Sequence, residues 1–104
     1  MIRIAAVYPR EAGKKFDLEY YVKTHLPMVR EKFGPFGLKK TEVDKAIEGL
    51  GGVTPPFFAI GYLYFDTLSD FHKGFAAIGA EIIANISMYT DVTPMIQISE
   101  VAER

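Results

Sequence analysis

The segment Phe57–Phe65 (FFAIGYLYF) is apolar along its whole length and is bounded by Pro55-Pro56 before it and Asp66-Thr67 after it. Its length and its aromatic content favour a β-strand. A strand that is apolar on both faces must be covered on both faces. The chain therefore has to build a sheet around this segment and to place a layer over each side of it.

Three further strands are expected, over residues 2–8, 38–47 and 95–101. The first is rich in β-branched residues and stops before Pro9. The second has a weak alternation of apolar and polar residues with three lysines, which suits an exposed edge strand because charge discourages pairing with other chains. The last follows Pro94 and alternates isoleucine with polar residues, as a strand with one buried face does.

Two helices are expected, over residues 17–33 and 67–82. Asp17 stands where the first helix needs an N-cap, and Phe16 and Tyr21 have the spacing of a hydrophobic staple. Thr67 fits the N-cap of the second helix, in which apolar residues recur every three or four positions. Glycines at positions 74 and 79 are expected to loosen that helix.

The elements follow one another in the order βαββαβ, which is the ferredoxin-like arrangement of four antiparallel strands with two helices on one face. A chain of 104 residues has the length of one domain, so residues 1–104 are expected to form a single α+β domain. Two helices cover only one face of the sheet. Because Phe57–Phe65 is apolar on both faces, we predict that a second copy of the chain covers the open face and forms a homodimer.

The composition excludes several classes of protein. The formal net charge is −1 and no run of Lys or Arg exceeds two residues, so nucleic acid is not an expected partner. The lack of Cys excludes disulfides and thiolate sites, and two His residues make a metal site hard to build, so no metal or cofactor is expected. The longest uncharged run, residues 49–65, is interrupted by Pro and Gly, so no membrane association is expected. With no signal peptide expected either, the sequence predicts a cytoplasmic protein.

His25 is the strongest single candidate for chemistry. It lies in the apolar stripe of the first helix, two residues before Pro27, which lacks the N–H that would bond the carbonyl of Lys23. We therefore expect a kink or a loosened turn beside His25. A titratable imidazole in an apolar pocket can act as a base or as a hydrogen-bond donor, whereas the alternative is a structural imidazole bonded to a backbone carbonyl. His72 lies off the apolar stripe of its helix and is expected at the surface.

The chain has six tyrosines, and a phenol in an apolar pocket can orient a carbonyl, phenolic or quinoid ligand. Tyr21, Tyr62 and Tyr64 are expected to line the pocket that contains His25, and Tyr89 to take part in ligand binding. Asp91 precedes the last strand and can orient the imidazole or hydrogen-bond a ligand. Packing in the core or the dimer is the alternative for each tyrosine, and a turn cap is the alternative for Asp91.

From end to end, the chain resembles the EthD family of dimeric α+β barrel proteins. The most specific match runs from a tyrosine pair to an H-x-P motif. The matching segments are Val7-Tyr8-Pro9, Phe16-Asp17-Leu18-Glu19-Tyr20-Tyr21, His25-Leu26-Pro27-Met28-Val29, Tyr62-Leu63-Tyr64-Phe65-Asp66, Tyr89-Thr90-Asp91-Val92-Thr93-Pro94 and Ile96-Gln97-Ile98-Ser99. The resemblance implies a ferredoxin-like protomer that pairs sheet to sheet with a second copy to form a barrel.

The EthD family is named from a gene cluster for oxidising ethyl tert-butyl ether and is grouped with oxidoreductases. Its wider superfamily includes cofactor-independent monooxygenases, muconolactone isomerases and haem-degrading oxygenases, and this chain lacks the tryptophan that the haem-degrading enzymes use. The resemblance places His25 and Pro27 in one family motif, and Tyr89 and Asp91 in another.

Two functions therefore stay open. The first is a cofactor-free oxidoreductase, isomerase or accessory protein of oxidative catabolism or secondary metabolism. It would bind a small apolar carbonyl, phenolic or quinoid compound, with His25 as base or hydrogen-bond donor. The second is a non-catalytic dimeric module, for ligand binding or stress response, in which His25 is structural.

Overall fold

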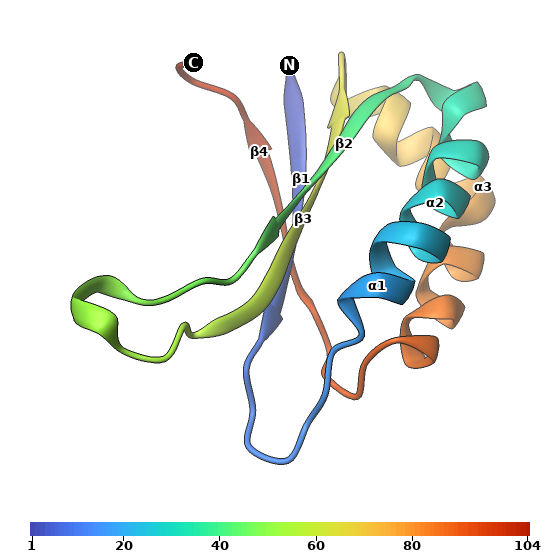
Figure 1. Ribbon diagram of the computed structural model, residues 1–104. Helices are drawn as coiled ribbons and strands as arrows, with labels where there is room; N and C mark the ends of the chain where they lie inside the picture. The colour runs from blue at the N-terminus through green and yellow to red at the C-terminus, as the bar shows by residue number, and fades with distance from the viewer.

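The computed structural model covers residues 1–104 and contains one four-stranded antiparallel sheet with its α-helices on one face (Figure 1). The strands are β1 (Ile2–Pro9), β2 (Leu38–Lys45), β3 (Phe57–Phe65) and β4 (Met95–Glu100), and their order in the sheet is β2-β3-β1-β4. The predicted α+β, ferredoxin-like arrangement is thereby confirmed. The all-apolar segment β3 pairs with β1 on one side and with β2 on the other, so it lies inside the sheet.

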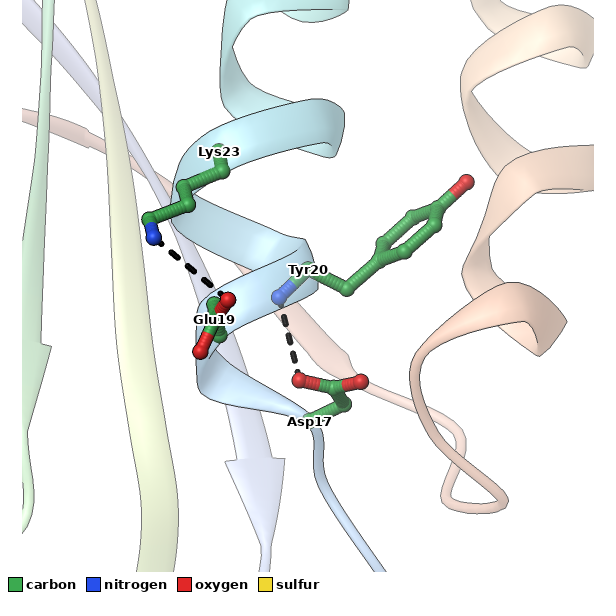
Figure 2. Close-up of polar contacts among 4 residues, drawn as sticks. All are labelled: Asp17, Glu19, Tyr20 and Lys23. Atoms are coloured by element: carbon green, nitrogen blue, oxygen red, sulfur yellow. Dashed lines mark hydrogen bonds and ion pairs between the residues drawn. The ribbon is translucent and has the colours of Figure 1, made fainter.

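The helical layer has two long components. The first is continuous through α1 (Leu18–Tyr20), the π-helix η1 (Tyr21–His25) and α2 (Leu26–Phe33); the second is α3 (Leu68–Asn85). The chain also contains three short 3-10 helices, η2 (Gly34–Phe36), η3 (Leu50–Gly52) and η4 (Ile86–Met88). Both predicted N-caps are present, because the side chains of Asp17 (Figure 2) and Thr67 each accept a hydrogen bond from a backbone N–H three residues later. No helix is both long and apolar enough to cross a membrane.

The loosened turn that was predicted beside His25 is the π-helix η1. The N–H of Leu26 bonds the carbonyl of Tyr21, five residues earlier. Pro27 follows at once and has no N–H with which to restore the regular α-helical pattern at Lys23. Both Tyr21 and His25 are buried, so the π-helix carries two large side chains into the interior.

Side chains alternate between the two faces of the sheet. Ile4, Ala6 and Tyr8 of β1 face the helices, whereas Arg3 faces the opposite side. The register pairs Ala6 with Gly61 and Ile4 with Leu63, so Gly61 and Leu63 also face the helices. The same register pairs Ala5 with Tyr62 and Arg3 with Tyr64, which places both tyrosines on the open face.

The open face is more polar than the sequence suggested. The Tyr64 hydroxyl donates to Glu42 (2.6 Å) and accepts from Arg3 Nε (3.0 Å), and the Tyr62 hydroxyl donates to Asp44 (2.9 Å). These contacts give β3 a partly polar cover within the monomer. The connection between β2 and β3 extends away from the helices, on the open side of the sheet (Figure 1).

Candidate functional site

A cavity of about 510 Å³ lies between the helical layer and the sheet. Its floor is the helix-facing side of β1, β3 and β4, and its walls come from η1, α2 and α3. Most of the lining is apolar: Ile4, Ala6, Leu26, Val29, Phe33, Gly61, Leu63, Phe71, Phe75, Ile82, Ile83, Ile86, Pro94, Ile96 and Ile98. A cavity of this size and character suits a small, mostly apolar molecule.

The polar groups of the cavity are few, and they belong to Tyr8, Tyr21, His25, His72 and Thr93. No Lys, Arg, Asp or Glu lines the cavity, so a charged ligand would find no opposite charge inside. Tyr8, Tyr21 and His25 are buried, whereas His72 is exposed, as expected. No group of three or more His, Cys, Asp or Glu side chains is placed to hold a metal ion.

His25 is the last residue of η1 and is only 3% exposed. Its Nδ1 lies 2.9 Å from Oδ1 of Asn85, the last residue of α3. The ring stacks on Tyr21, with centroids 5.3 Å apart and planes 17° apart, and its centroid lies 4.7 Å from that of Tyr89. Two aromatic rings and one amide therefore fix the position of the imidazole.

The second ring nitrogen of His25, Nε2, makes no hydrogen bond within the chain. Every side-chain nitrogen or oxygen that is fully buried does have a hydrogen-bond partner. Nε2 is therefore not fully buried, and because His25 lines the cavity, the cavity is the space to which this nitrogen has access. Burial lowers the pKa of His25 below its ordinary value of 6.5, although the hydrogen bond to Asn85 opposes the shift. At neutral pH the side chain is a neutral imidazole.

Three tyrosines are grouped near the imidazole. The hydroxyls of Tyr8 and Tyr89 are 2.6 Å apart, and the ring of Tyr8 meets that of Tyr21 edge-on at 5.4 Å. Burial raises the pKa of all three hydroxyls, so they stay protonated and can donate hydrogen bonds. The Tyr21 hydroxyl lies directly over Gly61 on the floor of the cavity, where a Cβ would overlap it.

The structure brings together only part of the predicted set of site residues. Tyr21 and Tyr89 both contact His25. Tyr62 and Tyr64 do not share the cavity, contrary to expectation, because the register of β3 turns them to the opposite face of the sheet. The side chain of Asp91 is exposed and makes no hydrogen bond to the imidazole, so the residue that orients His25 is not the predicted Asp91.

Three contributors were missed: Tyr8, Gly61 and Asn85. The alternation of β1 could have identified Tyr8, since it shares a face with Ile4. The sequence carried no signal for Asn85, which lies 60 residues from His25 and beyond the expected end of its helix. Its side chain reaches the site because the last turn of α3 packs beside η1.

Fold and site together define a class of protein: a ferredoxin-like α+β domain with an apolar cavity between helices and sheet and a buried imidazole in that cavity. The chain is similar to the crystal structure of an EthD-like protein from Ralstonia eutropha JMP134, at 35% sequence identity and a TM-score of 0.91. The match covers 99% of this chain and 93% of the other. The chain therefore belongs to the EthD family, as its motifs indicated.

Two further solved structures share the fold. An ethyl tert-butyl ether D (EthD) family protein from Bacillus halodurans C-125 matches at 20% identity and a TM-score of 0.68, over 96% of this chain and 97% of that one. A protein from Arabidopsis thaliana matches at 8% identity and a TM-score of 0.71, over 100% of this chain and 98% of that one. No family model and no curated protein matches the chain.

Proposed function

We propose that the cavity binds a small, uncharged, mostly apolar compound and that His25 removes a proton from it. The observation that carries the proposal is the free Nε2 of a buried, neutral imidazole that opens onto an apolar cavity. A neutral imidazole is a suitable general base near neutral pH, and proton removal from a carbonyl or phenolic compound is a common first step of isomerisation and of cofactor-independent oxidation. That no cofactor takes part stays a prediction.

The Tyr21 hydroxyl supplies the complementary group. It lies over Gly61 on the cavity floor and beside His25, and its raised pKa keeps it protonated. When Nε2 takes a proton from a carbon next to a carbonyl, the electron pair moves to the carbonyl oxygen. The Tyr21 hydroxyl, turned from Tyr8 to the carbonyl oxygen, then stabilises the resulting enolate by a hydrogen bond.

Proton exchange of 2-tetralone in D₂O, followed by NMR, tests this proposal. The compound is uncharged, bicyclic and acidic next to its carbonyl. We expect the protein to accelerate deuterium incorporation and the His25→Gln variant to lose at least about tenfold of that rate, since a positioned base contributes about 10²–10⁴-fold. Lys73→Gln, at an exposed position of α3 that does not line the cavity, is the control and should keep the rate. No acceleration over buffer, or equal rates for parent and His25→Gln, would overturn the proposal.

A non-catalytic binding module is the second candidate. Its supporting observation is that Asn85, Tyr21 and Tyr89 hold the His25 ring as tightly as a structural residue is held. In that case His25→Gln should lower stability by about 1–3 kcal/mol, because a buried hydrogen bond and ring packing are lost, without changing exchange of the probe. A thermal melt measured beside the exchange assay separates the two candidates.

We further propose that the protein forms a homodimer through the open face of the sheet. The β2–β3 connection supports this, since it extends on the open side and carries Ile47 and Leu50 at 89% and 100% exposure (Figure 1). Apolar side chains that are this exposed are usual at interfaces. In a face-to-face dimer the connection would lie along the second copy and bury both side chains.

A further inference from the structure

The amide of Asn85 is held from two sides. Its Oδ1 lies 2.9 Å from His25 Nδ1, and its Nδ2 donates to the hydroxyl of Tyr20 at 3.2 Å. Figure 2 shows the ring of Tyr20 extending from the start of the first helix toward the neighbouring helix, away from Asp17. With the amide nitrogen bonded to Tyr20, it is the amide oxygen that faces the imidazole, and an amide oxygen can only accept a hydrogen bond.

The contact therefore decides which nitrogen of His25 carries the proton. A neutral imidazole has one N–H, and here it must be at Nδ1 in order to donate to Asn85. Nε2 is left with a lone pair and no partner in the chain, and it opens onto the cavity. No Lys or Arg side chain lines the cavity to compete for that lone pair.

We propose that Asn85 is a positioning residue that sets the selectivity of the cavity: with Nδ1–H held by Asn85, Nε2 accepts only, so the site favours ligands that present a hydrogen to it. O–H, N–H and acidic C–H groups qualify. Isosteres that offer only an oxygen lone pair at this point leave Nε2 unpaired and lose affinity. This inference rests on the proposed binding of an uncharged ligand in the cavity.

A pair of probes isolates the effect. 2-Naphthol and 2-methoxynaphthalene are both uncharged and share one ring system, but only the naphthol presents an O–H. We expect isothermal titration calorimetry to show the parent protein binding 2-naphthol about tenfold more tightly than the methyl ether, the ratio that corresponds to one hydrogen bond. Equal affinities of the parent for the two probes would overturn the inference and leave the binding proposal intact.

Two variants test the role of Asn85. Asn85→Leu keeps a similar side-chain volume but removes the acceptor, so Nε2–H becomes accessible and the affinity ratio should fall toward one. Tyr20→Phe frees the amide to turn and should reduce the ratio in the same direction. Circular dichroism identifies the folded variants. If the variants that fold keep the same ratio of affinities for the two probes as the parent protein, Asn85 does not set the selectivity.

A third outcome concerns both proposals. If neither probe binds the parent protein, the cavity does not take an uncharged bicyclic ligand, and the proposed function is overturned together with the inference that rests on it. Binding of both probes with equal affinity overturns the inference alone. The two failures are therefore distinguishable in one titration series.

Discussion

Gly61 shows how one missing side chain shapes the site. Its Cα forms the part of the cavity floor over which the Tyr21 hydroxyl lies, and a Cβ there would overlap that hydroxyl. Tyr21 is almost fully buried between Tyr8 and His25, so its ring has little freedom to move aside. The position of Tyr21, and with it the stacking on His25, therefore depends on glycine at position 61.

Gly61→Ala should lower the free energy of unfolding by about 1–3 kcal/mol, the usual cost of forcing extra volume into a packed interior. Gly34→Ala is the matched control, because a Cβ at Gly34 would meet nothing within 4 Å. Urea denaturation of the three proteins measures the difference. Equal stability of the parent and both variants would show that Tyr21 can move away from β3 without cost.

The burial of His25 makes stability depend on pH. Burial lowers its pKa in the folded protein, so as pH falls the unfolded chain binds the proton first. The free energy of unfolding should therefore decrease as pH falls below about 6.5, the ordinary pKa of histidine, and approaches the lower pKa that His25 has in the folded protein. Melting curves at pH 7.5 and 5.5 measure it. His25→Gln should show a smaller loss over this interval, and an equal loss in both proteins would assign the effect to other groups.

At the scale of elements, the sequence predicted the four strands, the two long helices and both N-caps. Phe57–Phe65 was identified with its observed bounds because Pro-Pro and Asp-Thr delimit it. The loosened turn before Pro27 was also foreseeable, since a missing N–H has a local effect. The form of this turn could not be predicted: it is a π-helix that buries both Tyr21 and His25.

The errors in the candidate site have two physical causes. A strand that is apolar on both faces gives no signal for which residues face the helices, so the sequence could not place Tyr62 and Tyr64 on the open face. The apolar stripe of the second helix ends before the helix does. Asn85 therefore fell outside the expected element, and its contact with His25 depends on tertiary packing alone.

The glycines of α3 do not interrupt the helix, although they were expected to loosen it. Gly74 lets two elements approach, because a Cβ there would lie 2.8 Å from Phe33 Cδ1 and 3.0 Å from Phe36 Cβ. A Cβ at Gly79 would instead lie 2.7 Å from Cδ2 of Phe75, whose ring is partly exposed at the cavity.

Alanine at these two positions should have opposite effects. Gly74→Ala should destabilise by about 1–3 kcal/mol, since the ring of Phe33 is held in the core and the Cβ of Phe36 is fixed to its backbone. Gly79→Ala should leave stability unchanged or raise it by up to about 1 kcal/mol, because Phe75 can move and alanine favours the helix. Chemical denaturation compares the two variants. A similar loss in both would mean that the ring of Phe75 is as fixed as that of Phe33.

The molecule as a whole has two different faces. The helix-facing side contains the cavity and the buried imidazole, whereas the open side carries a polar network over β3 and the projecting β2–β3 connection (Figure 1). The proposed dimer would use the open side only, so both cavities of a dimer would stay accessible. Binding and assembly are therefore expected to be separable by mutation.

Leu50→Asp tests the assembly. The side chain is fully exposed in the monomer, so the substitution should leave folding unchanged and weaken the dimer at least about tenfold, because a charge would be buried against the second copy. Met88→Ser, at an exposed position in the helical layer, is the control and should not change assembly. Sedimentation equilibrium measures both. A monomeric parent protein, or an unchanged dimer in Leu50→Asp, would contradict the proposed interface.

The protonation of His25 tests the proposed role of its imidazole, and ¹⁵N NMR of the imidazole nitrogens at pH 7.5 measures it. The chain has two histidines, and the His72→Gln variant assigns the resonances that belong to His25. We expect a neutral His25 with its proton on Nδ1, and a change in the Nε2 resonance when 2-naphthol is added. A proton on Nε2, an imidazolium, or no response of Nε2 to saturating 2-naphthol would contradict the proposed role.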